Sequence, residues 1–127
     1  MSLSINPFQS EYLASGSADQ TVRIWDLHEA NCVQSYRDLH ADKVQVVRWN
    51  NTNEQVLLTG GYDGRINVLD VRAPAGNIAT SLDKSTYKDI ESAQWHPKSE
   101  HYFVVTTESG HMVGFDSRHI DKPVFNV

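Results

Sequence analysis

A sequence pattern that returns every 44 to 46 residues constrains this chain more than any other feature. Aspartates end three alternating runs at Asp26, Asp70 and Asp116, at spacings of 44 and then 46 residues. Two further sets of markers keep the same spacing: the turn residues Asp19, Asp63 and Ser109, and the segments that begin at residues 4, 48 and 94. A period of about 40–45 residues is typical of repeats that each fold as one four-stranded β-sheet. The pattern therefore predicts about three such repeats in tandem.

The middle repeat has the pattern of four strands. Residues 44–49, 56–59, 65–69 and 78–82 are rich in apolar and β-branched residues, and turn-forming segments separate them. Asp63-Gly64, between the second and third runs, is a strong signal for a tight hairpin. No long window shows the i, i+3, i+4 spacing of a helix. We therefore expect an all-β chain of four-stranded antiparallel units over residues 1–38, 39–83 and 84–127, the first incomplete at its N-terminus and the third degenerate.

Residues 13–26, with the sequence LASGSADQTVRIWD, resemble the core of a WD40 repeat. The resemblance implies blades of a partial β-propeller. Within that family the chain is most similar to the periodic tryptophan proteins, through residues 6–8, 15–26, 57–63, 115–118 and 121–125. This narrower resemblance implies a protein-binding scaffold in the nucleus and nucleolus, with a role in large-subunit ribosome assembly and rRNA processing. The partners it implies are pre-ribosomal assembly factors and histones.

The WD40 resemblance also implies a buried chain of hydrogen bonds in each blade. Its members are a histidine before the first strand, a hydroxyl on the second, the turn aspartate and a tryptophan on the third. The matching residues are Ser15, Asp19 and Trp25 in the first blade and His40, Thr59 and Asp63 in the second. Leu69 replaces the tryptophan in the second blade, and Ser109 and Phe115 depart from the pattern in the third. We expect the third blade to be the least cooperative, because each lost partner removes about 1 kcal/mol.

His40 beside Asp63 could be mistaken for half of a catalytic dyad. A dyad needs a nucleophile within hydrogen-bond reach, in a cleft that a substrate can enter. The blade pattern buries these side chains within a sheet, so a structural role is the better interpretation. The remaining histidines lack metal-binding spacing, and Gly60, Gly61 and Gly64 lack the strand-loop-helix setting of a phosphate loop. We expect no enzymatic activity, no cofactor and no metal site.

Charge and cysteine content exclude several further classes of protein. The chain has 16 acidic and 11 basic residues, a formal net charge of −5, and shows no basic stripe for a phosphate backbone. We therefore expect no direct binding to nucleic acid. Cys32 is the single cysteine, which excludes an internal disulfide and suits a reducing compartment. The apolar runs are too short to cross a bilayer, and residues 1–8 lack a signal-peptide pattern. The chain is predicted to be soluble and intracellular.

Two sets of residues are candidates for protein binding. The first consists of loop residues on the face that propellers commonly present to partners: Asp42, Lys43, Tyr62 and Glu108. Tyr62 is a good interface anchor because tyrosine offers a large contact area and a hydroxyl at low entropy cost. It also fits the role of an ordinary turn residue.

The second set consists of Arg72 and Arg118, each two residues after the aspartate of its repeat. This Asp-x-Arg pattern resembles the motif by which some WD40 proteins bind the adaptor of a cullin-type ubiquitin ligase. A substrate receptor of such a ligase is therefore the alternative function. A local ion pair between each arginine and its neighbouring aspartate is the competing interpretation.

Three blades are too few to close a propeller, which needs roughly 4–8. The terminal blades are expected to expose apolar faces that neighbouring blades would cover. Either the chain is part of a larger propeller, which we favour, or two copies close a ring of six blades. The inner-strand residues Trp49 and Trp95 are expected to pack in the core or between blades.

Overall fold

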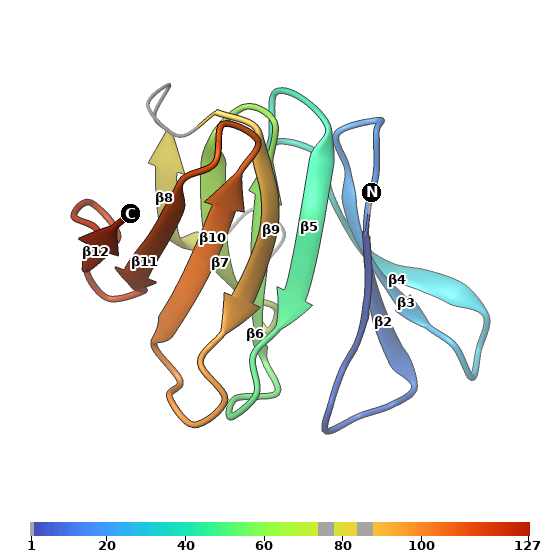
Figure 1. Ribbon diagram of the computed structural model, residues 1–127. Helices are drawn as coiled ribbons and strands as arrows, with labels where there is room; N and C mark the ends of the chain where they lie inside the picture. Colours follow the sequence, from blue (N-terminus) through green and yellow to red (C-terminus); the bar gives the residue numbers. More distant parts are fainter. Residues whose placement is uncertain (1, 74–77, 84–87) are drawn as a thin grey trace.

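The computed structural model describes residues 2–73, 78–83 and 88–127, and they form three four-stranded antiparallel sheets (Figure 1). The first sheet contains β1 (Ser2–Ile5), β2 (Tyr12–Gly16), β3 (Val22–Asp26) and β4 (Asn31–Tyr36). The second contains β5 (Val44–Trp49), β6 (Val56–Gly61), β7 (Arg65–Asp70) and β8 (Ile78–Asp83). The third contains β9 (Ile90–Trp95), β10 (Tyr102–Thr107), β11 (Met112–Asp116) and β12 (Phe125–Asn126). The all-β prediction of about three four-stranded units is confirmed.

Within each sheet the strands follow one another in sequence order, each paired with the next. The sheets lie side by side through their first strands, so that β5 contacts both β1 and β9 (Figure 1). Among the described residues no helix is long and apolar enough to span a bilayer.

The turns between the second and third strands of the sheets share one backbone feature. Gln20, Gly64 and Gly110 lie at equivalent places in the repeat and have positive φ angles of 74°, 78° and 95°. Glycine adopts this conformation without strain, whereas Gln20 does so at a cost. The Asp63 carboxylate helps to close the second turn by accepting the Arg65 amide at 3.0 Å.

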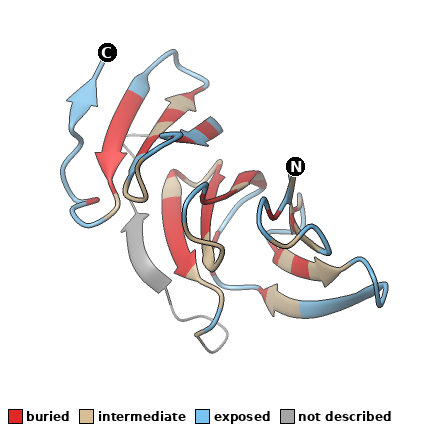
Figure 2. Cartoon of the chain, turned by 90° about the horizontal axis from the view of Figure 1, so that it is seen from below, coloured by how far each residue is buried: buried red, intermediate tan, exposed pale blue. Residues whose placement is uncertain are grey.

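Apolar side chains fill the two contacts between neighbouring sheets, here called the first seam and the second seam. Val47 and Leu57 of the second sheet pack with Ile24 of the first sheet in one buried cluster. Val46 and Leu58 face the other way and pack with Phe103 and other residues of the third sheet. In Figure 2 the buried segments accordingly lie where one sheet faces the next. The second sheet is therefore covered on both faces, whereas the outer two have one neighbour each.

A tryptophan at the end of an inner strand ties each seam together. Trp49 Nε1 donates to the carbonyl oxygen of Ser4 at 2.9 Å across the first seam. Trp95 Nε1 donates to the carbonyl oxygen of Arg48 at 3.0 Å across the second. Both indoles are buried, and each reaches back to the inner strand of the preceding sheet. Inter-blade packing, one of the two roles expected for these tryptophans, is thus what the structure shows.

An asparagine makes a second bond across each seam in the opposite direction. Asn6 Nδ2 donates to the carbonyl oxygen of Glu54 at 2.9 Å, and Asn50 Nδ2 donates to that of Glu100 at 2.8 Å. The side-chain oxygens of the same asparagines accept backbone amides of their own turns. Each asparagine thus shapes the turn after an inner strand and fastens that turn to the next sheet.

The outer faces of the first and third sheets expose apolar side chains. Ile5 occupies the repeat position of Trp49 but is 57% exposed, against 5% for Trp49. On the third sheet, Met112 is exposed, and the exposed Val124 and Phe125 line an apolar hollow of about 470 Å³. These faces have the composition of the seams but no neighbouring sheet among the described residues.

Candidate functional site

His40 is the centre of a hydrogen-bonded group in the second sheet. Its Nδ1 lies 3.1 Å from Asp63 Oδ1, and its Nε2 lies 2.9 Å from Thr59 Oγ1. A carboxylate can only accept a hydrogen bond, so we assign the proton to His40 Nδ1, which donates it to Asp63. Nε2 then accepts from the hydroxyl of Thr59. His40 is only 3% exposed and Thr59 is fully buried. A substrate therefore cannot reach these side chains, and the geometry is that of a structural network.

Asp63 holds the segment before β5 as well as the imidazole. Its Oδ2 accepts the Ala41 amide at 2.7 Å. Burial raises the pKa of Asp63, but the bonds from His40 and from the Ala41 amide outweigh burial and leave the pKa below its usual value. The network thus holds Asp63 as a carboxylate that joins the loop before β5 to the β6–β7 turn.

Asn67 on β7 belongs to the same network, although the sequence did not single it out. Its Nδ2 donates to the carbonyl oxygen of Leu39 at 3.2 Å and lies 3.4 Å from Thr59 Oγ1. Asn67 is fully buried between the apolar residues Ile66 and Val68 of β7. That isolated amide was the signal that could have predicted its role.

The first sheet carries two separate pairs in place of a single chain of bonds. Trp25 Nε1 donates to Ser15 Oγ at 2.9 Å. Asp19 lies in the β2–β3 turn, where its Oδ1 accepts from the Thr21 hydroxyl at 2.6 Å. That hydroxyl bond is the main reason why the pKa of Asp19 lies below its usual value.

The third sheet replaces most of the polar network with aromatic packing. The Phe115 ring stacks on Phe103 at a centroid distance of 5.4 Å, and Trp95 meets Phe103 edge-on at 5.3 Å. The hydroxyls of Thr107 and Ser109 lie 3.0 Å apart and form a small polar pair in the turn. The third sheet is thus held by dispersion and ring geometry where the second is held by hydrogen bonds.

Arg72 and Arg118 each form a two-pronged ion pair with the aspartate two residues before. Arg118 Nε and Nη2 donate to the two carboxylate oxygens of Asp116 at 3.0 and 2.8 Å. Arg72 makes the same contacts with Asp70. The bond from Arg118 lowers the pKa of Asp116 to about 2. Two donors of each guanidinium are therefore already committed within the repeat, as the local ion-pair interpretation expects.

The candidate loop residues Asp42, Lys43, Tyr62 and Glu108 lie at the end of the sheets that carries the β2–β3, β6–β7 and β10–β11 turns. Asp42, Lys43 and Glu108 are exposed. The Tyr62 hydroxyl donates to Glu91 Oε1 at 2.7 Å and so joins the second sheet to the third. That bond, together with the negative charges of Glu91, Glu108 and Asp89, raises the pKa of Tyr62 to about 12. The surface around Tyr62 is therefore acidic.

Metal binding finds no support in the described residues, where no three His, Cys, Asp or Glu side chains gather closely enough to hold an ion.

Comparison with known families identifies the repeat. The family model "WD domain, G-beta repeat" matches residues 1–26 and 30–70. The chain belongs to the WD40 family. Each of the three sheets is accordingly a WD40 blade, and the three together form part of a β-propeller.

Individual WD40 relatives match the chain over most of its length. Periodic tryptophan protein 1 of Saccharomyces cerevisiae is 34% identical over 100% of this chain, and its Drosophila melanogaster homolog is 32% identical over 93%. The Methylosome protein WDR77 of Xenopus laevis is 32% identical over 77%. The matches span only 22%, 26% and 29% of these three relatives. The chain therefore spans about a quarter of the length of these relatives.

Proposed function

We propose that this chain is part of a non-enzymatic WD40 scaffold that acts in the nucleolus, in assembly of the large ribosomal subunit. The observation that carries the proposal is the similarity to Periodic tryptophan protein 1 of yeast over the whole chain. The buried position of the His40 network supports the non-enzymatic part, because the His40–Asp63 pair, which resembles half of a catalytic dyad, is closed to substrate.

The charge of the surface favours basic partners, such as ribosomal proteins and histone tails. Tyr62 is surrounded by Glu91, Glu108 and Asp89, and the chain as a whole carries a formal net charge of −5. Complementary charge speeds association and fixes orientation. Asp42, Lys43, Tyr62 and Glu108 are the contact residues of this proposal.

The units of the scaffold are the blades at residues 1–38, 39–83 and 84–127, and further blades cover the outer faces of the first and third. Without such further blades Ile5 and Met112 are exposed, although the equivalent repeat positions of the second blade are buried in the seams. Closure by two copies of this chain is the alternative. Light scattering separates the two arrangements, because a folded monomer of 14.3 kDa excludes self-closure.

Affinity purification of the full-length tagged protein from nuclear extract, followed by mass spectrometry, tests the function. We expect enrichment of large-subunit assembly factors over a tagged control with an unrelated propeller. Recovery of cullin-ligase adaptors instead would overturn the proposal and assign adaptor binding to Arg72 and Arg118. In that case changing both arginines to alanine would abolish adaptor binding without unfolding the protein.

A further inference from the structure

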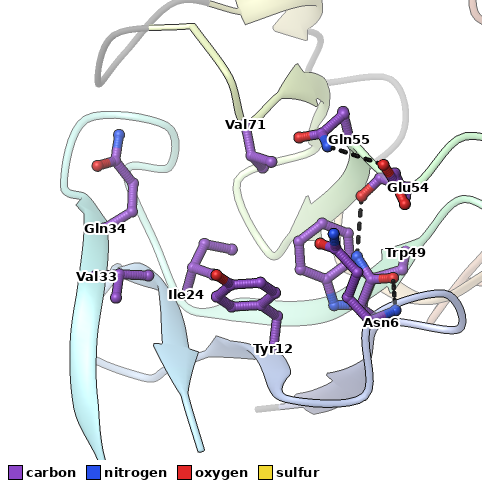
Figure 3. A pocket seen from close by; sticks show the side chains of 10 residues that line it. Asn6, Tyr12, Ile24, Val33, Gln34, Trp49, Glu54, Gln55 and Val71 are labelled. Atoms are coloured by element: carbon purple, nitrogen blue, oxygen red, sulfur yellow. Dashed lines mark hydrogen bonds between the residues drawn. The ribbon is translucent and has the colours of Figure 1, made fainter. Parts of the chain in front are cut away.

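A cavity of about 390 Å³ opens in the first seam, at the end of the blades opposite the Tyr62 surface (Figure 3). Ten residues from both blades line it: Asn6, Gln9, Tyr12, Ile24, Val33, Gln34, Trp49, Glu54, Gln55 and Val71. In Figure 3 the ring of Tyr12 lies between Val33 and Gln34 on one side and Trp49 and Glu54 on the other. The hydrogen bond from Asn6 to the Glu54 carbonyl closes one edge of the cavity and fixes the two blades there.

The lining combines an apolar floor with acceptors and a single charge. Ile24, Val33 and Val71 supply aliphatic surface, and three glutamines bring side-chain amides to the lining. Glu54 is the one charged side chain among the lining residues, and lysine and arginine are absent from them. In the described part of the chain, Glu54 forms no ion pair, and its Oε1 receives a bond of 3.4 Å from Gln55. The carboxylate is therefore left available to an incoming cation.

The second seam provides an internal comparison, because the repeat places Glu100 where the first seam has Glu54. Glu100 Oε1 accepts from Asn53 Nδ2 at 2.9 Å, and its Oε2 lies 3.4 Å from His101 Nε2. Val56 stands in place of Tyr12 and packs against the core of the second seam. The glutamate carboxylate at this repeat position thus has partners within the chain at the second seam, whereas at the first seam it remains available to a ligand.

A side chain that fits the open seam needs an apolar stem, a positive head and several donors. Arginine meets all three requirements, because its stem packs on aliphatic surface and its planar head stacks on aromatic rings. The guanidinium can also donate to a carboxylate and to amide oxygens at once. We propose that the cavity between the first two blades binds an arginine side chain of a protein partner, with Glu54 as the counter-charge and Tyr12 as the stacking surface. This inference rests on the proposed scaffold function and gives it a specific contact.

The test uses a small probe and the 127-residue chain. N-acetyl-arginine N-methylamide is titrated into labelled protein, and the backbone amides of Tyr12, Gln34 and Gln55 and the indole of Trp49 are followed by NMR. We expect saturable shifts confined to these signals and weakened by salt. N-acetyl-norleucine N-methylamide, which has the stem without the charge, should produce no saturable shifts.

Three variants, one of them a control, decide between recognition of the charge and adventitious binding. Glu54→Gln should weaken the affinity by about tenfold, as expected when one charge-assisted bond is removed. Glu100→Gln is the matched control at the equivalent repeat position, and the affinity should stay unchanged. Tyr12→Val introduces the residue that the second blade has at this place and should also weaken binding.

Shifts of equal size with the norleucine probe, or an affinity that Glu54→Gln leaves intact, would overturn the proposal. So would shifts that map to the Tyr62 surface, because a general attraction to an acidic protein would then explain them. The titration involves no ribosomal component. Failure of the nuclear purification with a positive titration would therefore refute the ribosomal role alone, and the reverse result would refute the arginine site alone.

Discussion

Trp95 donates its indole proton to the carbonyl oxygen of Arg48 at 3.0 Å, across the seam between the second and third blades. Trp49 makes the same bond to Ser4 across the first seam. Because the acceptor is a strand carbonyl, the bond depends on the tryptophan and not on the identity of the residue that it meets. The blades are thus joined by a hydrogen bond that the backbone of any neighbouring strand can accept, and this suits a repeat protein.

Replacing Trp95 with phenylalanine should lower the free energy of unfolding by about 2 kcal/mol. The change removes the indole donor from the Arg48 carbonyl and opens a small cavity where the buried indole was. Denaturant unfolding of both proteins measures the loss. Trp25→Phe is the comparison, because Trp25 bonds within its blade at a half-buried site where water can replace the lost donor. A larger loss for Trp25→Phe would show that the bond across the seam stabilises the chain less than the bond within the blade.

Asp63→Asn should destabilise the chain at neutral pH by about 1.5–3 kcal/mol, the range for a bond to a charged group. The folded-state pKa of Asp63 is lowered, since bonds from His40 and the Ala41 amide outweigh the effect of burial. Its contribution is therefore present above the unfolded pKa of about 3.9 and is lost as pH falls through the folded pKa. The difference between wild type and variant should shrink below about pH 4.

Unfolding curves at several pH values check this expectation, with Asp42→Asn as the control at an exposed site. A wild-type advantage that persists unchanged in acid would contradict it, because a protonated Asp63 cannot keep the charged bonds.

The fold could be predicted from the sequence because its signals are local. The Asp63-Gly64 step and the alternation of residues 65–69 mark a hairpin without reference to any other blade. The WD40 resemblance also pointed to the contacts of His40 with Thr59 and Asp63. In the first blade the same pattern grouped Asp19 with Ser15 and Trp25, whereas in the structure Asp19 bonds to Thr21 and stays apart from that pair.

The seams and the cavity could not be predicted in the same way. Asn6 and Asn50 bond to backbone carbonyls of the next blade, and no side-chain pattern marks such an acceptor. Whether Glu54 or Glu100 is left open depends on which side chain lies opposite, and that is set by the packing of two blades. These properties belong to pairs of repeats, whereas the sequence pattern describes one repeat at a time.

Tyr62 should titrate late, with a pKa of about 12, because its hydroxyl donates to Glu91 and acidic side chains surround it. A raised pKa favours the protonated hydroxyl in the folded state. The contribution is therefore present below the usual tyrosine pKa of about 10 and is lost as pH rises through the folded value. Glu91→Gln should move the titration toward the usual value by removing the charge.

Absorbance of tyrosinate in the wild type minus that in Tyr62→Phe isolates this one group from the other tyrosines. Tyr102→Phe removes a different tyrosine, which is exposed, and is the control for the subtraction. A difference curve centred near pH 10 would show that the Tyr62–Glu91 bond does not persist in solution.

Strand β10 of the third blade should exchange its backbone amide protons faster than the equivalent strand β6 of the second. In β6, Thr59 is tied through His40 to Asp63 and the loop before β5. In β10, Val105 stands at the repeat position of Thr59, and the hydroxyl of Thr107 bonds within its own turn, to Ser109 and His111. The aromatic contact of Phe103 with Phe115 stabilises the third blade by about 0.5–1.5 kcal/mol. The loss of two hydrogen bonds of the polar network destabilises it by about 2 kcal/mol.

Native-state hydrogen exchange of residues in β6 and β10 measures the difference directly. Thr59→Val should bring the protection of β6 down toward that of β10, because the variant leaves His40 Nε2 and the amide of Asn67 without the hydroxyl. Thr107→Val, the same change at a different position in β10, should alter that strand less, since the Thr107 hydroxyl serves an exposed turn. Equal protection of the two strands in the wild type would mean that ring packing replaces the polar network at no cost in local stability.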